Sequence, residues 1–165
     1  MNARIACFAF LVMTSLWGWA DQAMPGDEPG TALQRQPSPE GAAVEISNIE
    51  DGAVVPPTFL VQFSVTGMGI APAGSNIPDT GHHHLLIDVV ELPDPNLPLP
   101  KSDQFMHFGG GQTEAELTLP EGEHTLQLVF ADYLHIPHDP VVKSTPITIV
   151  VTADAETASG EPDED

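Results

Sequence analysis

The stretch LTLPEGEHTLQLVFAD, residues 117–132, indicates the fold class of this protein. A strand ends before the turn PEG at 120–122, and the next strand starts at Glu123 with apolar residues at alternate positions. Such alternation is typical of a half-buried β-strand, because successive side chains point to opposite faces. Immunoglobulin-like domains form the corner between their strands E and F in this way, with a Tyr near the start of strand F. His124 takes the place of that Tyr, so the stretch predicts an immunoglobulin-like domain.

The same alternation recurs on both sides of this stretch, between residues 44 and 152. Twelve prolines in that region leave no room for a long helix, because Pro lacks a backbone donor and clashes with the preceding turn. The expected strands cover 44–49, 58–65, 82–92, 114–119, 123–131 and 147–151, with room for a short one near 105–108. Six to seven short strands predict an all-β fold, an antiparallel immunoglobulin-like β-sandwich.

Residues 1–20 have the three-part pattern of a secretory signal peptide. Arg4 precedes an apolar run from Ile5 to Trp17, and small residues stand at the cleavage-site positions before Asp21. The apolar run is shorter than the roughly 20 residues that a membrane-spanning helix needs. We therefore expect export to the periplasm or the medium, removal of residues 1–20, and no membrane span in the mature chain.

Two further segments flank the expected sandwich domain, residues 44–152. Residues 21–43 are rich in Pro and Gly without hydrophobic periodicity, which predicts a disordered linker, and residues 153–165 form an acidic tail that is also expected to be disordered. The single Cys lies in the expected signal peptide, so no disulfide is predicted. With 24 acidic and 4 basic residues, the net charge of −20 excludes nucleic acid as a partner, because phosphate backbones need a basic face. The sequence points to no particular protein partner.

Three sequence motifs occur in a fixed order within the expected domain. They are GHHHLLID at 81–88, HFGGGQTE at 107–114 and GEHTLQLVFAD at 122–132, followed by HIPH at 135–138. Together they resemble an uncharacterised bacterial secreted family that is catalogued as a domain of unknown function. The resemblance covers most of residues 44–151 and implies no established activity, so the function has to be inferred from the residues themselves.

All seven histidines lie between positions 82 and 138, and none falls in the expected linker or tail. His82 and His84 share one face of a strand, as residues i and i+2 do. Two imidazoles in this arrangement can converge on one metal ion, with further ligands from another part of the chain. The strand pair therefore predicts one side of a metal site.

The remaining ligands follow from the expected topology. If strands 82–92 and 123–131 are the antiparallel neighbours C and F, the start of strand C lies beside the loop that follows strand F. That loop contains two histidines, and another histidine precedes the strand that starts at the same end of the domain. The predicted metal ligands are His82, His84, His107, His135 and His138. Imidazole ligands suit copper and zinc, which are the expected ions.

Several other side chains have weaker signals. Met68 and Met106 can supply thioether ligands to copper, but Met more often fills gaps in a core. His83 alternates with apolar neighbours and His124 stands at the expected corner, so structural roles are predicted for both. The glycines at 109–111 are expected to form a tight turn that needs positive φ.

Three functions are compatible with these patterns, and an exported protein that binds copper or zinc is favoured. The alternative is an envelope interaction module that binds a protein or a glycan, with the histidines as a structural hydrogen-bond network. An enzyme is less favoured, because only Asp88 and Asp132 offer a general base and no nucleophile motif is present. Ring nitrogens that converge on one point would support metal binding, whereas rings bonded to separate backbone carbonyls would support the network.

Overall fold

The computed structural model describes residues 34–157. Outside the described residues lie the expected signal peptide, residues 21–33 of the predicted linker and residues 158–165 of the predicted tail. Among the described residues there are ten β-strands, one 3-10 helix and no α-helix. The elements are β1 (Ala43–Ile46), β2 (Val54–Val55), β3 (Thr58–Thr66), β4 (Gly69–Ile70), β5 (Thr80–Ile87), β6 (Phe105–His107), β7 (Glu114–Thr118), β8 (Gly122–Ala131), β9 (Pro137–Lys143), β10 (Ile147–Val151) and η1 (Ala153–Thr157). Within residues 34–157, no helix is long and apolar enough to cross a membrane.

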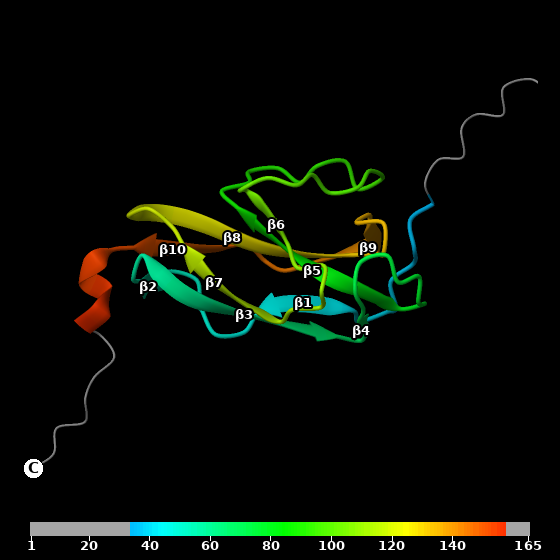
Figure 1. The fold of residues 1–165 in the computed structure, drawn as a ribbon, viewed down its shortest axis with the longest axis horizontal. Helices are drawn as coiled ribbons and strands as arrows, with labels where there is room; N and C mark the ends of the chain where they lie inside the picture. The colour runs from blue at the N-terminus through cyan, green and yellow to red at the C-terminus, as the bar shows by residue number, and fades with distance from the viewer. Residues whose placement is uncertain (1–33, 158–165) are drawn as a thin grey trace, which may run out of the picture. The chain divides into compact units, whose positions relative to one another are not determined.

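The strands form two sheets that enclose one core (Figure 1). One sheet has the order β1-β3-β7, and the other has the order β2-β10-β8-β5-β4, with β6 beside β5 and β9 beside β8. The central pairs are antiparallel, whereas the short pairs β2–β10 and β4–β5 are parallel. Phe63 of β3 and Leu126 of β8 are buried in the same apolar cluster, which joins the two sheets. The predicted all-β, immunoglobulin-like sandwich is confirmed.

His124 holds the corner between β7 and β8, as the sequence predicts. Its Nε2 lies 2.9 Å from the carbonyl oxygen of Pro120, and its Nδ1 lies 2.8 Å from Oδ2 of Asp88. Burial by itself would lower the pKa of His124, but the hydrogen bonds to Asp88 and Pro120 and the Asp88 charge outweigh it, so the pKa is raised. Asp88 follows the end of β5, so it does not lie with His82 near the start of that strand. This corner is a structural feature, separate from the other histidines.

Strand β9 differs from the sequence prediction, which places a loop at its start. Pro137 and Pro140 suggest a loop because Pro cannot donate to a sheet. In the structure, β9 and β10 both pair with β8, along its last and first residues respectively. Between them, Ser144 accepts a hydrogen bond from the Leu128 amide at its Oγ and donates its own amide to the Leu128 carbonyl. Strands β9 and β10 therefore follow one another along β8, interrupted at Ser144. Strand β9 thus forms part of the sheet edge where a loop was predicted.

Both flanks of the predicted domain make contacts that the sequence did not indicate. Ser38 donates its amide to the Asp139 carbonyl, and Asp139 donates its amide to the carbonyl of Gln36. Arg35 adds an ion pair with the Asp139 carboxylate at 3.3 Å. The described end of the predicted linker is therefore bonded to β9, and the start of the predicted tail forms η1.

A second, smaller apolar cluster lies on the face of β5 and β8 that points away from the main core. Leu86 and Val129 of the sheet are buried against Leu99, which belongs to the connection of residues 88–104. Figure 1 shows this connection on the side of β5 opposite β1 and β3. It covers a sheet face that would otherwise meet water, and this is the face that carries His82 and His84.

Candidate metal centre

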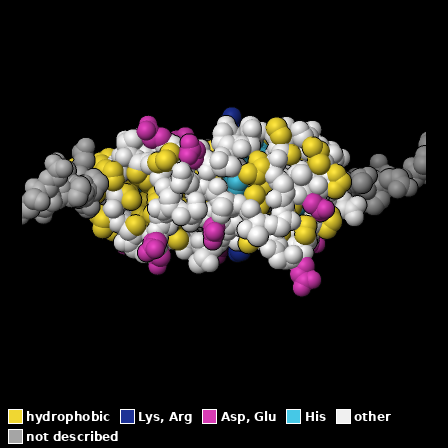
Figure 2. Space-filling view, turned by 90° about the horizontal axis from the view of Figure 1, so that it is seen from below, with side chains coloured by type: hydrophobic (Ala, Val, Ile, Leu, Met, Phe, Trp, Pro, Cys, Tyr) yellow, Lys and Arg dark blue, Asp and Glu magenta, His cyan; other side chains and the backbone are white. Residues whose placement is uncertain are grey.

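Strand β5 positions two histidines on the covered face of the sheet. Its pairing with β8 is antiparallel, as predicted, and places His82 opposite Ala131 and His84 opposite Val129. Because side chains alternate along a strand, His83 points instead into the main core, between Phe63 and Phe130. His82 and His84 are 0% and 1% exposed, although imidazole is a polar group. Figure 2 shows acidic side chains scattered over one face of the molecule and histidine only in a small central area.

The pairing of β6 with β5 brings His107 to the same face of the sheet as His82 and His84. β6 runs beside β5 with His107 opposite His84, so the two side chains lie on the same face. The glycine turn after β6 makes room for the ring: a Cβ at Gly109 would stand 2.2 Å from Cε1 and 2.3 Å from Nε2 of His107. Of the three glycines, only Gly111 has a positive φ, of 83°. Positive φ therefore explains Gly111, whereas close approach to His107 explains Gly109.

His135 lies in the tight connection between β8 and β9. Oδ1 of Asp132 accepts hydrogen bonds from the amides of Leu134 at 2.8 Å and Ile136 at 2.9 Å, which closes the loop around His135. His135 itself has a φ of 68°, a left-handed conformation that a side chain rarely adopts, and its carbonyl accepts the Leu99 amide. Asp132, considered from sequence as a base, thus shapes the loop that presents His135.

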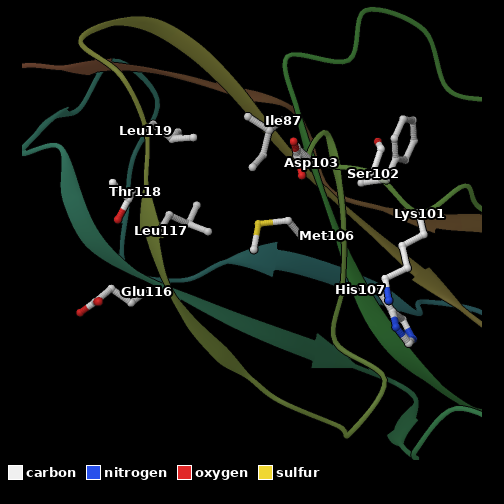
Figure 3. Close-up of a pocket in the computed structure, with 11 residues that line it drawn as sticks. Ile87, Lys101, Ser102, Asp103, Met106, His107, Glu116, Leu117, Thr118 and Leu119 are labelled. Atoms are coloured by element: carbon white, nitrogen blue, oxygen red, sulfur yellow. The ribbon is translucent and has the colours of Figure 1, made fainter.

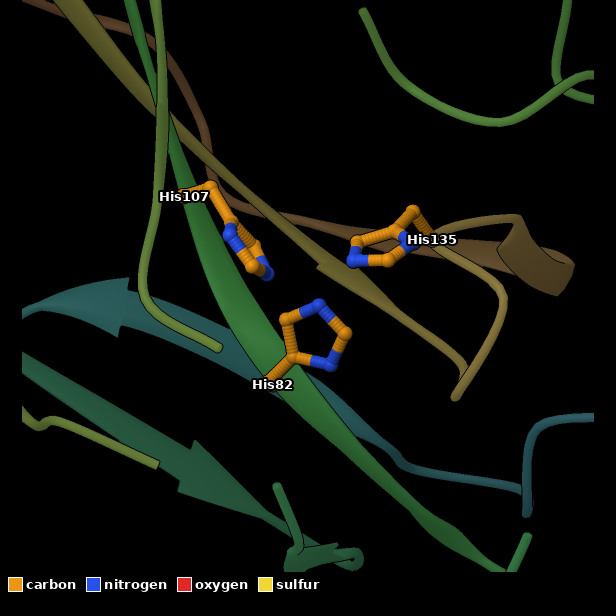
Figure 4. A group of neighbouring side chains, drawn as sticks. All are labelled: His82, His107 and His135. Atoms are coloured by element: carbon orange, nitrogen blue, oxygen red, sulfur yellow. The ribbon is translucent and has the colours of Figure 1, made fainter. Parts of the chain in front are cut away.

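The rings of His82, His107 and His135 converge on one space (Figure 4). One nitrogen from each ring lies within 4.8 Å of the nitrogens of the other two. Three points so spaced lie within about 2.8 Å of a common centre, close to the roughly 2.0–2.1 Å of a zinc–imidazole bond. The three histidines therefore form a cluster that can hold a metal ion after a small adjustment of the rings.

His84 brings a fourth imidazole to this cluster. Its Nε2 lies 3.1 Å from Nε2 of His82, and its ring centroid is 5.1 Å from that of His107 and 5.8 Å from that of His135. Two nitrogens bound to one ion are about 2.8 Å apart at a right angle and about 3.3 Å apart at a tetrahedral angle, for bonds of about 2.0 Å. The observed separation falls in this interval. The four rings, which we call the histidine cluster, are His82, His84, His107 and His135.

The histidine cluster has few hydrogen-bond partners for its buried nitrogens. Nδ1 of His82, Nδ1 of His84 and Nε2 of His107 are buried without a partner. If His82 and His84 share a proton between their Nε2 atoms, the other nitrogen of each ring still lacks a partner in the interior. Buried polar groups are usually hydrogen-bonded, since an unpaired one costs about 1–3 kcal/mol. The cluster is therefore poorly explained as a hydrogen-bond network.

Burial favours the neutral form of three cluster imidazoles, those of His82, His84 and His107. Loss of solvation, followed by repulsion from His107 and His135, lowers the pKa of His82 to about 4. Loss of solvation, followed by repulsion from His82 and His107, lowers the pKa of His84 to about 2. The pKa of His107 is also lowered, chiefly by burial. At neutral pH these rings carry free lone pairs, which is the form that a metal ion binds.

The fifth predicted ligand, His138, does not join the cluster. Its ring is fully buried and stacks on Phe130, and its two nitrogens each lie 3.3 Å from a backbone carbonyl oxygen, of Phe130 and of Thr80. Because β9 is a strand, His138 pairs into the sheet edge, whereas the predicted loop would have left it free to turn toward His82. Its geometry is that of a structural histidine.

The two methionines considered as copper ligands also lie elsewhere. Met68 and Met106 both pack against the main core between the sheets. Met106 precedes His107 on β6, and the alternation of a strand turns their side chains to opposite faces. The cluster therefore offers nitrogen ligands only.

One feature of the site was missed at the level of sequence, namely Lys101. A cavity of about 300 Å³ lies beside the cluster and is lined by His84, His107, His135, Leu99, Pro100 and Lys101. The lining residues from 99 to 101 belong to the connection between β5 and β6, which has no periodic pattern to reveal its position. The scarcity of basic residues, four in the whole sequence, was the available signal.

Comparison with known proteins places the chain in a family. A search of curated proteins gives no match. Among solved structures, the chain is similar to the fibronectin(III)-like modules of Clostridium thermocellum CbhA, with 14% identity, coverage of 66% of this chain and 92% of that chain, and a TM-score of 0.29. The sequence model of a domain of unknown function matches residues 61–152, a range that includes the whole histidine cluster. The chain therefore belongs to the family described as "Domain of unknown function (DUF4399)", in agreement with the motif resemblance.

Proposed function

We propose that this protein binds one divalent transition-metal ion, copper or zinc, through the histidine cluster. The observation that carries the proposal is the convergence of ring nitrogens of His82, His107 and His135 within 4.8 Å of one another. His84 adds a fourth nitrogen within reach of the same space. An ion bound there would give a partner to Nε2 of His107, which otherwise has none in the interior.

Two of the three histidines outside the cluster support this interpretation by contrast. His124 and His138 both place their ring nitrogens at oxygen acceptors, as scaffolding histidines do. None of the described hydrogen bonds joins a cluster ring to a backbone carbonyl. His83, the third histidine outside the cluster, also has two buried ring nitrogens without a partner, but it lies between Phe63 and Phe130 in the main core. Among the described residues, the cluster is the place where several imidazoles converge, as a metal requires.

The ligand set favours borderline ions. Neutral imidazole binds copper and zinc well, whereas calcium and magnesium prefer oxygen ligands. For a given nitrogen site, affinity for divalent first-row metals is highest with Cu²⁺. The net charge of −20 raises the local concentration of any cation, but without selecting among them.

A calorimetric titration of metal-free protein tests this proposal. We expect one Cu²⁺ or Zn²⁺ per chain, with Cu²⁺ bound more tightly, in moderate salt that screens diffuse attraction to the acidic surface. Mg²⁺ at the same concentration should give no comparable binding, since the cluster contains no oxygen ligand. A Zn²⁺ isotherm no steeper than that of Mg²⁺ would contradict the proposal.

We also propose that the protein acts after export, in the periplasm or the medium. The support is the signal-peptide pattern of residues 1–20, which lie outside the described residues. The exported chain is expected to begin at Asp21 and to contain no Cys. Intact-mass spectrometry of material from the periplasmic and culture fractions measures this directly. A mass that retains residues 1–20 would exclude the proposed processing.

A further inference from the structure

The cavity beside the histidine cluster combines two features that are unusual together. His84, His107 and His135 form one part of its lining, and Lys101 contributes the one charged side chain to that lining. Figure 3 shows the Lys101 side chain extending toward the ring of His107 in a neighbouring cleft, which these two residues also line. The cavity is therefore lined both by cluster histidines and by a cationic side chain.

The charges around a bound metal ion would be unbalanced. The four imidazoles are neutral ligands, so an ion in the cluster keeps its two positive charges in a buried position. The cavity lining contains no Asp or Glu, although the chain has 24 acidic residues. Lys101 adds a third positive charge and makes no ion pair with a carboxylate of residues 34–157. An anion in the cavity would balance both the ion and the lysine.

We propose that the metal ion in the histidine cluster takes a small anion as an additional ligand, held in this cavity between the ion and the Lys101 ammonium. The inference rests on the proposed metal binding and adds the class of its second ligand. It also accounts for the presence of a lysine beside a cation site. Lys101 repels the metal ion, but it attracts the anion that the ion binds. Charge-assisted hydrogen bonds between an ammonium and an anion are about twice as strong as neutral ones.

The cavity has ample room for a small anion. Its volume of about 300 Å³ is at the lower end of the range for small-molecule sites. Leu99 and Pro100 supply the apolar part of its lining. A linear or planar anion with one donor atom for the metal and another for Lys101 suits this arrangement.

Azide binding to the Cu²⁺-loaded protein tests the inference. Azide is a linear anion, and its bond to Cu²⁺ produces a charge-transfer absorption band. We expect azide to bind the wild-type protein and to bind Lys101→Gln about tenfold more weakly, because one positive charge beside the anion is lost. Lys101→Arg should restore most of the affinity, and Lys143→Gln, an exposed position on β9, should match the wild type.

The metal affinity of the same variants separates the two proposals. Lys101→Gln should bind Cu²⁺ at least as tightly as the wild type, since the substitution removes a charge that repels the metal. If the wild type binds no Cu²⁺, both the proposed function and this inference fail. If Cu²⁺ binds but azide leaves its spectrum unchanged, or binds Lys101→Gln as tightly as the wild type, this inference alone is overturned.

Discussion

Replacing His82 and His84 together with Ala should weaken binding of Zn²⁺ or Cu²⁺ by at least about 100-fold. Loss of a group that merely orients a metal ligand already costs about 10–100-fold in affinity, and this change removes two ligands. Both side chains are buried and share the face of β5 from which the cluster is built. Calorimetry on metal-free wild type and variant, in the same buffer and salt, measures the difference.

Two substitutions elsewhere serve as matched controls. His124→Ala and His138→Ala each remove a buried imidazole whose nitrogens lie at other acceptors, so both variants should keep the metal affinity within about threefold while losing stability. His107→Ala, at a partly buried position, provides a second ligand deletion if the double variant folds poorly. Equal affinity in the double variant and the wild type would show that the histidines are scaffolding, and an envelope interaction module would then be the better hypothesis.

The metal-free protein should lose stability steeply as the pH falls from about 6.5 toward 5. The pKa of His82 is lowered to about 4 and that of His84 to about 2 in the folded state, whereas an unfolded chain has histidines near 6.5. Below pH 6.5 the unfolded state therefore binds more protons than the folded state, and acid favours unfolding. Each such histidine contributes a slope of up to about 1.4 kcal/mol per pH unit in the free energy of unfolding.

Urea unfolding between pH 7.5 and 5 measures this slope before most carboxylates become protonated. The His82→Ala, His84→Ala double variant should show a flatter dependence, because two of the four histidines with a lowered pKa are gone. His124 acts with the opposite sign: its pKa is raised, so its contribution to stability is present in acid and is lost as the pH rises through that pKa. A wild-type stability that stays constant from pH 7 to 5 would show that the cluster histidines are not held neutral by burial.

The fold followed from short-range patterns, because a strand is recognised from residues two positions apart. Alternation in residues 123–131 identified β8, and the turn before it identified the corner that His124 holds. The same rule placed His82 and His84 on one face and His83 on the other. Strand β9 was not predicted, because Pro137 and Pro140 locally favour a loop. In the folded domain, pairing with the end of β8 overrides that local preference.

The composition of the site depended on contacts between segments far apart in the chain. The sequence determined that the molecule is a β-sandwich with a pair of histidines on one strand face and further histidines near one end. The tertiary structure decided that His107 stands opposite His84, that His135 enters the cluster while His138 does not, and that Lys101 lies beside it. Local periodicity contains no information about register between strands or about how an irregular connection covers a sheet, because both are set by the packing of the whole domain.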